Sequence, residues 1–273
     1  MKSIALGQYY PSNSVLHRLD PRIKILLAIL YIVCSFLCKN ALSFAILALS
    51  SLFIILLGKI PYRIIAGGIK PVLIILIFTA VINIFWTTGQ TPLVSWKFIN
   101  IYLEGIYSAI FIIVRITSLI IGTSLFMTYT TTPIELTDGI EDLLSPLKKL
   151  HVPVHDFAMM MTIALRFIPT LIEETDKIMT AQKARGADFS SGSLIDRAKA
   201  LIPVLIPLFV SSFNRAADLA TAMECRCYHG GEGKTRMKVR HISVRDIIAL
   251  ILVVALGAVI LLANVLNIPY ALG

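Results

Sequence analysis

The stretch ALSFAILALSSLFIILLG, residues 41–58, contains no charged side chain. A helix of about 20 apolar residues is long enough to cross the hydrocarbon core of a bilayer. The composition of the whole chain supports this interpretation, because 57% of its 273 residues are hydrophobic and only 15% are charged. A water-soluble domain of this length would have too few polar side chains to cover its surface. The sequence therefore predicts an integral membrane protein.

Four other apolar runs are also candidate membrane spans. Together with the first, they cover residues 25–38, 41–58, 69–86, 106–127 and 247–266. Only Lys39 and Asn40 separate the first two runs, so we expect these to form a tight helical hairpin. Backbone polar groups inside a bilayer must be paired within the chain, and a helix pairs them all. We predict an all-α integral membrane protein with about five transmembrane helices and with its termini on opposite sides.

Positive charge is distributed unequally along the chain, and this predicts its orientation. Of the 25 lysine and arginine residues, 22 precede the first span, separate the second span from the third, or lie between Thr128 and Asp246. Lysine and arginine gather on the cytoplasmic side of membrane proteins. We therefore expect the N-terminus and the long segment before the last span in the cytoplasm. The basic residues of that segment are mixed with acidic ones, so no nucleic-acid partner is expected.

The long segment is predicted to form three cytoplasmic helices. The first begins at Thr132-Pro133-Ile134-Glu135, where threonine and glutamate have the spacing of a capping box and proline occupies the first turn. An apolar stripe follows at steps of three and four residues: Ile140, Leu143, Leu144, Leu147 and Leu150. The predicted domains are residues 1–128 for the first four spans, 129–245 for the cytoplasmic helices and 246–273 for the last span.

The second and third cytoplasmic helices share one design. We predict them over residues 156–185 and 194–226, each with an apolar first half that contains proline and a polar second half. Gly186 should end the second helix, because glycine readily adopts the left-handed conformation found just after helix ends. Ala216 and Ala220 lie four residues apart on the third helix and are small enough to let another helix cross closely.

Both helices end in a matching motif, TAQKARG at residues 180–186 and TAMECRC at residues 221–227. Each arginine stands between two small residues, in Ala184-Arg185-Gly186 and in Cys225-Arg226-Cys227. An arginine at a helix end gains about 0.3–1 kcal/mol from the helix dipole, but lysine would serve equally well. Small neighbours instead let the planar guanidinium enter a groove and bind a carboxylate through two hydrogen bonds. Two such tips suit a partner with two equivalent acidic grooves.

Two further groups of side chains are candidate sites of other kinds. Asp138, Glu141 and Asp142 are the acids available to a magnesium site or to an intramembrane lipid- or prenyl-modifying enzyme. Acidic residues are also favoured near helix N-termini by the helix dipole, which is the simpler explanation. Cys225 and Cys227 with His229 supply only three metal ligands, so no metal site is expected.

Arg115 lies well inside the fourth span. An arginine within a membrane suggests a functional role, or pairing with a nearby hydroxyl or backbone carbonyl. An autonomous channel or carrier would need polar groups along a path through the spans. Apart from Arg115 and Asn83 the spans offer few, so this class of protein is not favoured.

A resemblance to a known family covers nearly the whole chain. It rests on SVLHRLDPRIKI at residues 14–25, on TTPIELTDGIEDLLSPLKKLHVP at residues 131–153, and on the two arginine motifs. The chain resembles the transmembrane T component of energy-coupling factor (ECF) transporters, which are found in the bacterial cell membrane. Ala184-Arg185-Gly186 has the form usual in that family, whereas the second motif keeps Arg226 but differs in both flanking residues.

The resemblance implies a non-catalytic scaffold. It would join two ABC-type ATPase subunits to a separate substrate-binding membrane subunit, the S component, so the partners would bind ATP and magnesium and this chain no cofactor. Each arginine motif would enter a groove on one ATPase, and two crossed helices would transmit the movement. The expected S-component contacts are Met159, Met160, Met161, Leu205, Phe209 and Phe213. The cargo would be a vitamin or other micronutrient or, alternatively, cobalt or nickel in a dedicated importer.

Overall fold

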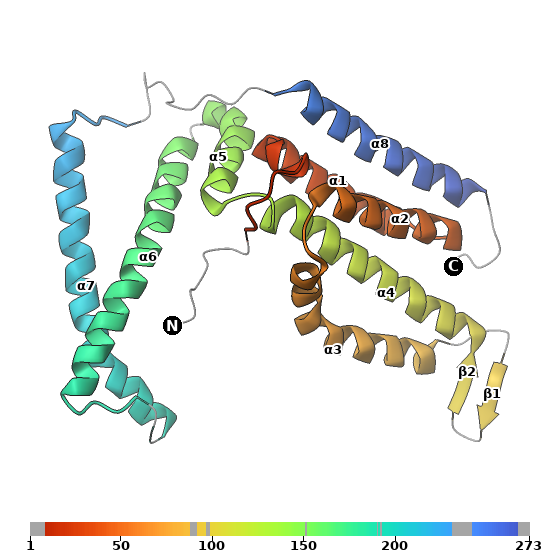
Figure 1. Ribbon diagram of the computed structural model, residues 1–273, viewed down its shortest axis with the longest axis horizontal. Coiled ribbons are helices and arrows are strands. Elements are labelled where there is room, and N and C mark those ends of the chain that lie inside the picture. Colours follow the sequence, from red (N-terminus) through yellow and green to blue (C-terminus); the bar gives the residue numbers. More distant parts are fainter. Residues whose placement is uncertain are drawn as a thin grey trace. The chain divides into compact units, whose positions relative to one another are not determined.

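The computed structural model describes residues 9–87, 92–96, 99–150, 152–189, 191, 193–230 and 242–266 (Figure 1). The chain folds as two compact units. The first comprises Met1–Asp142 with Val239–Gly273, and the second comprises Leu143–Lys238. We call the first unit the bundle, because it holds all five predicted spans. We call the second the crossed pair, because it holds the two long helices that end in the arginine motifs.

The described elements of the bundle are predominantly helical, which confirms the predicted fold class. In chain order they are η1 (Leu16–Arg18), α1 (Pro21–Leu37), α2 (Ala41–Gly58), α3 (Tyr62–Trp86), β1 (Pro92–Trp96), β2 (Ile99–Tyr102), α4 (Leu103–Thr123), the π-helical turn η2 (Ser124–Thr128), α5 (Pro133–Leu144) and α8 (Val244–Val265). The strands β1 and β2 form a short antiparallel hairpin between α3 and α4, which the sequence did not lead us to predict.

All five predicted spans fall on helices, namely α1, α2, α3, α4 with η2, and α8. By length and composition alone, six helices in the described part of the chain could cross a membrane: α2, α3, α4 with η2, α6 (Val154–Ala184), α7 (Leu194–Cys225) and α8. The helices α6 and α7 are the two least apolar of these six, because the second half of each is polar. At 17 residues, α1 is the shortest of the predicted spans.

Helix α1 packs against α4, η2 and α8. Its Tyr31 and Leu27 are fully buried, as are Leu125 of η2 and Ile260 of α8. The ring of Tyr31 lies against the backbone of Gly122 in α4, where an added Cβ atom would collide with the ring. The close approach of α1 and α4 therefore requires glycine at this position.

Polar groups tie the first turn of α1 to the rest of the bundle. The Asp20 carboxylate caps α1 by accepting a hydrogen bond from the amide of Arg22 at 2.9 Å. The amide of Asp20 in turn donates to the carboxylate of Asp246 in α8 at 2.8 Å. The ammonium group of the buried Lys24 donates to the carbonyl of Thr130 at 2.8 Å. The segment SVLHRLDPRIKI thus fixes α8 and the chain after η2 relative to α1.

The first turn of α1 also holds α5. Arg22 forms an ion pair with Asp142. Gly139 lies so close to Pro21 that an added Cβ atom would come within 2.9 Å of the proline Cβ. The helix that carries the chain out of the bundle is therefore attached at two points to the segment that organises the bundle.

The first predicted cytoplasmic helix is α-helical over only part of its apolar stripe. Its capping box is confirmed, because the amide of Thr132 donates to Glu135 at 3.2 Å and the amide of Glu135 donates to the Thr132 hydroxyl at 3.3 Å. The α-helix ends at Leu144, and the chain continues as the 3₁₀ helix η3 (Ser145–Leu150). Pro146 has no amide proton and cannot continue the α-helical hydrogen bonds. The predicted helix is therefore helical through Leu150, but its last six residues form a 3₁₀ helix in place of an α-helix.

Arg115 supports the turn between α1 and α2. Its Nη2 donates to the carbonyl of Cys38 at 2.9 Å, and its guanidinium lies over the Phe44 ring, 5.1 Å from the centroid. Cys38 caps the C-terminus of α1, where the helix dipole favours a cation. The hypothesis that Arg115 pairs with a backbone carbonyl is confirmed.

The substitution Gly122→Ala should destabilise the bundle by about 1–3 kcal/mol, because the added methyl group cannot fit beside Tyr31 unless buried helices shift. The thermal unfolding midpoint of the purified protein in detergent measures this effect. Gly67→Ala in α3 is the matched control, since nothing lies within 4 Å of its added Cβ atom. The control should keep or slightly raise the midpoint of the unchanged protein, because alanine is the better helix former. Equal midpoints for the two variants would contradict the close packing of α1 and α4.

Candidate functional site

The candidate site is built on α6 and α7, which run in opposite directions. Glu174 of α6 meets Arg215 of α7, whereas Gln182, further along α6, meets the earlier residue Pro203 in α7. The two helices are therefore antiparallel. The two arginine motifs consequently lie at opposite ends of the crossed pair (Figure 1).

Helix α7 continues through two prolines. It begins after a capping box, in which the amide of Ser193 donates to the Asp196 carboxylate at 3.2 Å. Pro207 has no amide proton to donate to the carbonyl of Pro203, four residues earlier. The side-chain amide of Gln182 donates to that carbonyl instead, at 3.4 Å. A polar side chain of α6 thus satisfies a backbone group that α7 leaves open, which helps fix the two helices in register.

An ion pair joins equivalent positions of the two helices, and we call this contact the crossing. Arg215 Nη2 lies 2.6 Å from Glu174 Oε2, and the two residues are 41 positions apart. Arg185 and Arg226 are separated by the same number of positions. A two-fold rotation that exchanges the helices would therefore have the ion pair on its axis. Each arginine motif lies eleven residues beyond the crossing, or about 16 Å at 1.5 Å per residue.

The contact faces of the two helices obey the same relation. The buried or half-buried positions of α7 between residues 200 and 223 are matched, 41 residues earlier, by half-buried positions of α6. They pair Ile163 with Val204, Phe167 with Leu208, Thr170 with Ser211, Leu171 with Ser212, Ile178 with Leu219, and Gln182 with Met223. The repeat therefore extends along the contact face of α7 and is not confined to the motifs, whereas α6 buries further positions that have exposed counterparts in α7.

The residues expected to mediate the crossing do not do so. Ala216 and Ala220 are exposed, and the prediction that they face the other helix is wrong. Successive residues of an α-helix are about 100° apart, so Ala216 points away from the direction of Arg215. Ser211 and Leu219, four residues before and after Arg215, lie on the contact face instead.

Both helices end in the same hydrogen-bond pattern. In α6 the amides of Gly186 and Ala187 donate to the carbonyls of Lys183 and Gln182, both at 3.0 Å. In α7 the amides of Cys227 and Tyr228 donate to the carbonyls of Glu224 and Met223 at 2.8 and 3.0 Å. These bonds form a Schellman motif, which needs a left-handed residue directly after each arginine. Gly186 has φ +89°, as predicted for a helix stop, and Cys227 has φ +52°.

Cys227 adopts a backbone conformation that glycine would adopt more easily. The left-handed region costs an ordinary residue about 1–2 kcal/mol, because its Cβ approaches the next carbonyl oxygen. The second motif nevertheless has the same turn as the first. The two tips thus match in backbone geometry although their flanking residues differ.

All six motif residues are exposed: Ala184, Arg185, Gly186, Cys225, Arg226 and Cys227. Within the described ranges, neither Arg185 nor Arg226 forms a hydrogen bond or ion pair through its guanidinium. The imidazole of His229 is hydrogen-bonded to the Cys227 carbonyl at 2.8 Å. Each tip thus presents an arginine between small neighbours, a geometry suited to a carboxylate in a partner's groove.

The first halves of α6 and α7 expose apolar side chains. Phe209 and Phe213 have 61% and 72% of their surface exposed, and Leu205, Met160 and Met161 are also exposed. Met159 is half-buried. Five of the six residues expected to contact a membrane partner are therefore accessible in this chain.

The acidic residues of α5 do not converge on one another as a catalytic or metal site. Asp142 pairs with Arg22, Glu141 is buried and Asp138 is exposed. Across the residues with a described placement, no group of three or more His, Cys, Asp or Glu side chains could hold a metal ion.

Comparison with known proteins identifies the family. A family described as "CbiQ: Cobalt transport protein" matches residues 12–238. The chain belongs to the CbiQ family. A relative from Clostridium kluyveri is 52% identical over 97% of this chain and 98% of its own length. Others from Ruminiclostridium cellulolyticum and Bacillus subtilis are 54% and 45% identical over 87% and 95% of this chain and 88% and 98% of their own lengths. Each is named energy-coupling factor transporter transmembrane protein EcfT.

The family match and the relatives named EcfT confirm the resemblance stated from the motifs. Two features of the site were missed from the sequence, the Glu174–Arg215 crossing and the bond from Gln182 to Pro203. The 41-residue spacing of the motifs could have revealed the ion pair. When this spacing is applied to the whole of both helices, Glu174 and Arg215 fall at equivalent positions and carry opposite charges.

The substitution Cys227→Val should loosen the tip of α7, because a β-branched residue is strained at positive φ. The readout is hydrogen exchange at the Tyr228 amide, which donates to Met223. A cost of one to two kcal/mol predicts exchange that is roughly 5–30-fold faster. Cys227→Gly is the matched control and should exchange no faster than the unchanged protein. The assigned turn would be wrong if all three proteins exchanged at one rate.

Proposed function

We propose that this chain is the transmembrane component of an ECF transporter and couples ATP hydrolysis by two cytosolic ATPase subunits to uptake of a small substrate. The observation that carries the proposal is the pair of matching arginine tips at opposite ends of the crossed pair. The EcfT names of relatives that align along nearly their full length support it. The chain itself has a non-catalytic role.

The geometry of the tips favours a two-fold partner. The tips have the same backbone turn and lie equally far from a crossing that has pseudo-two-fold symmetry. An ATPase dimer offers two equivalent grooves related by such an axis. Acidic side chains in each groove would bind the guanidinium of Arg185 or Arg226 through two hydrogen bonds.

The ATP-binding site belongs to the partners in this proposal. The sequence contains GGEGKT at residues 230–235, which resembles the end of a phosphate-binding loop. The full loop requires a further glycine five residues before Gly233, and Tyr228 occupies that position. In this proposal the chain binds no cofactor, and ATP with magnesium is held by the ATPases.

The orientation follows from charge. Positive residues concentrate before α1, between α2 and α3, and between η2 and α8. The N-terminus and the crossed pair accordingly lie on the cytoplasmic side of the bacterial cell membrane. In this arrangement α6 and α7 are coupling helices and not spans, and their exposed apolar first halves meet other apolar surfaces.

The exposed apolar side chains are the proposed contact with the substrate-binding S component. Phe209 and Phe213 with Leu205 form one strip on α7, while Met160 and Met161 with the half-buried Met159 lie on α6. Methionine adapts to changing neighbours because it is unbranched and polarisable. Movement of the ATPases would shift the crossed helices and thereby reorient the S component.

A dedicated cobalt or nickel importer is a second candidate for the complete transporter. The matching family is described as a cobalt transport protein, whereas the relatives are named as energy-coupling factor components. The role of this chain is the same in both cases. The cargo, a vitamin or other micronutrient or a metal ion, would be selected by the S component.

The substitutions Arg185→Glu and Arg226→Glu should each weaken ATPase binding by about 2–5 kcal/mol, because they place a carboxylate in an acidic groove. The affinity of the full chain for the purified ATPase subunits measures the effect. The double variant should reach the membrane but lose transport. Arg197→Glu is the control, because this arginine is exposed on α7 outside the motif. Unchanged co-purification of the ATPases with the double variant would refute the docking role.

A further inference from the structure

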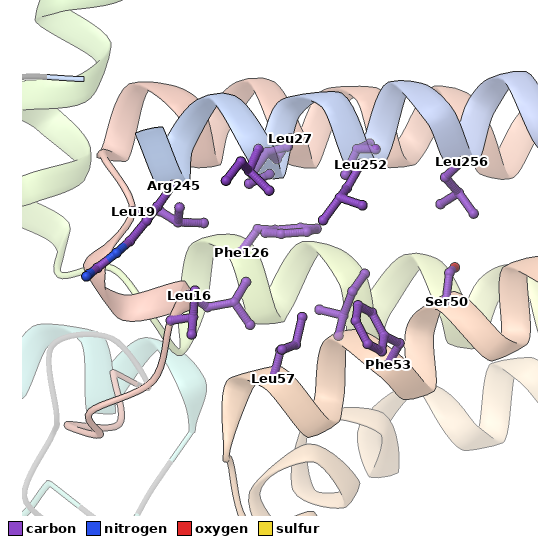
Figure 2. Close-up of a pocket in the computed structure, with 15 residues that line it drawn as sticks. Leu16, Leu19, Leu27, Ser50, Phe53, Leu57, Phe126, Arg245, Leu252 and Leu256 are labelled. Carbon is purple, nitrogen blue, oxygen red and sulfur yellow. The ribbon is translucent and has the colours of Figure 1, made fainter. Parts of the chain in front are cut away.

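The bundle contains a groove whose lining residues have no role in the proposed function. It lies between α2 and α8 with η1 at one end, and its volume is about 430 Å³ (Figure 2). Ligand pockets in proteins commonly occupy about 300–1,000 Å³, so the groove is large enough for a small molecule or part of a lipid. Its walls are apolar and include Phe53 and Leu57 of α2, Ile248 and Leu252 of α8, and Phe126 of η2.

The groove exists because α8 does not follow α2 along its whole length. Asn40, at the start of α2, donates to the carbonyls of Ala263 and Asn264 near the end of α8. Toward the start of α8, Leu16 and Leu19 border the groove instead. The two helices therefore separate toward the start of α8, and no other helix occupies the space between them in the described part of the bundle.

The groove opens toward the surroundings of the bundle. Phe53, Leu252 and Ile248 line it, and yet more than half of the surface of each side chain is exposed. Both α2 and α8 are candidate membrane spans. Within a bilayer such an opening faces lipid chains, so an acyl chain is the natural apolar occupant.

A polar pocket adjoins one end of the groove. Its volume is about 330 Å³, and it is lined by Asn13, Ser14, Val15, Arg18 and Arg245. Val15 and Arg245 also line the apolar groove, so the two hollows adjoin at these two residues. Arg245 lies at one end of the groove, and Ser50 and Leu256 lie toward the other (Figure 2).

The two arginines of the polar pocket are available to a ligand. Arg18 and Arg245 are both exposed, and no carboxylate in the described part of the chain pairs with either guanidinium. The hydroxyl of Ser14 lies 2.7 Å from the imidazole of His17, so the pocket wall also carries fixed polar groups. Two cations beside an apolar groove complement an anionic headgroup attached to a hydrocarbon chain.

We infer that this composite site binds one anionic phospholipid. An acyl chain occupies the groove between α2 and α8, and the phosphate group lies between Arg18 and Arg245. A zwitterionic lipid fits less well, because its own ammonium group would be brought to the two cations. Free phosphate has the charge but would leave the apolar groove empty.

Native mass spectrometry of the full chain, released from vesicles of mixed lipids with identical acyl chains, tests this site. The unchanged protein should retain phosphatidylglycerol about tenfold or more over phosphatidylcholine, because two arginines act on the headgroup. Arg18→Gln and Arg245→Gln should each reduce that preference about fivefold. Arg63→Gln is the charge control, because Arg63 is exposed on α3 outside the site. Added inorganic phosphate should not displace the lipid.

A second pair of variants tests the groove independently. Ala249→Phe would fill the groove and should abolish retention of phosphatidylglycerol, since Ala249 lines it. Ala255→Phe adds the same ring to an exposed position of α8 outside the groove and should leave retention unchanged. Equal retention of the two lipids by the unchanged protein would overturn the inference. Displacement by phosphate, or full retention by a folded Ala249→Phe protein, would do the same.

Discussion

The crossing of α6 and α7 at Glu174 and Arg215 is the constraint on which the placement of the functional tips depends. Because equivalent residues of the two helices meet there, the equivalent arginines 185 and 226 lie equally far from the crossing, in opposite directions. A partly exposed ion pair contributes only about 0.2–1 kcal/mol to stability. Its larger effect is on register, since sliding either helix by one turn would separate the charges and break the bond from Gln182 to Pro203.

The bundle has an organising point of its own at the first turn of α1. Asp20 and Lys24 hold α8 and the chain after η2, while Arg22 holds α5 through Asp142. Helix α5 carries the chain from the bundle to the crossed pair. On the proposed function, force from the ATPases passes through the arginine tips into the crossed helices, and α5 is the attachment that keeps the bundle connected to them. The first turn of α1 therefore holds the membrane spans together and also anchors the helix that connects them to the coupling helices.

Much of this architecture could be predicted from the sequence, because apolar runs, caps and motifs are local signals. The five spans, the Thr132–Glu135 box and the stop at Gly186 all follow from a few neighbouring residues. The change from α-helix to 3₁₀ helix after Leu144 was missed because the apolar stripe continues unchanged through Leu150. The wrong choice of Ala216 and Ala220 arose because small size does not indicate which face of a helix is buried. Contacts between distant segments, such as Asp20 with Asp246, leave no local pattern.

The distance between the two tips tests the central claim most directly. Pulsed electron paramagnetic resonance measures this distance between spin labels on Cys225 and on a cysteine introduced by Ala184→Cys. The substitution Cys227→Gly removes the neighbouring exposed thiol. The remaining cysteines, Cys34 and Cys38, are buried and should not be labelled. Antiparallel helices that cross eleven residues before each tip predict one narrow distribution between about 20 and 35 Å. A distribution near about 10 Å, the spacing of neighbouring parallel helices, would contradict the account.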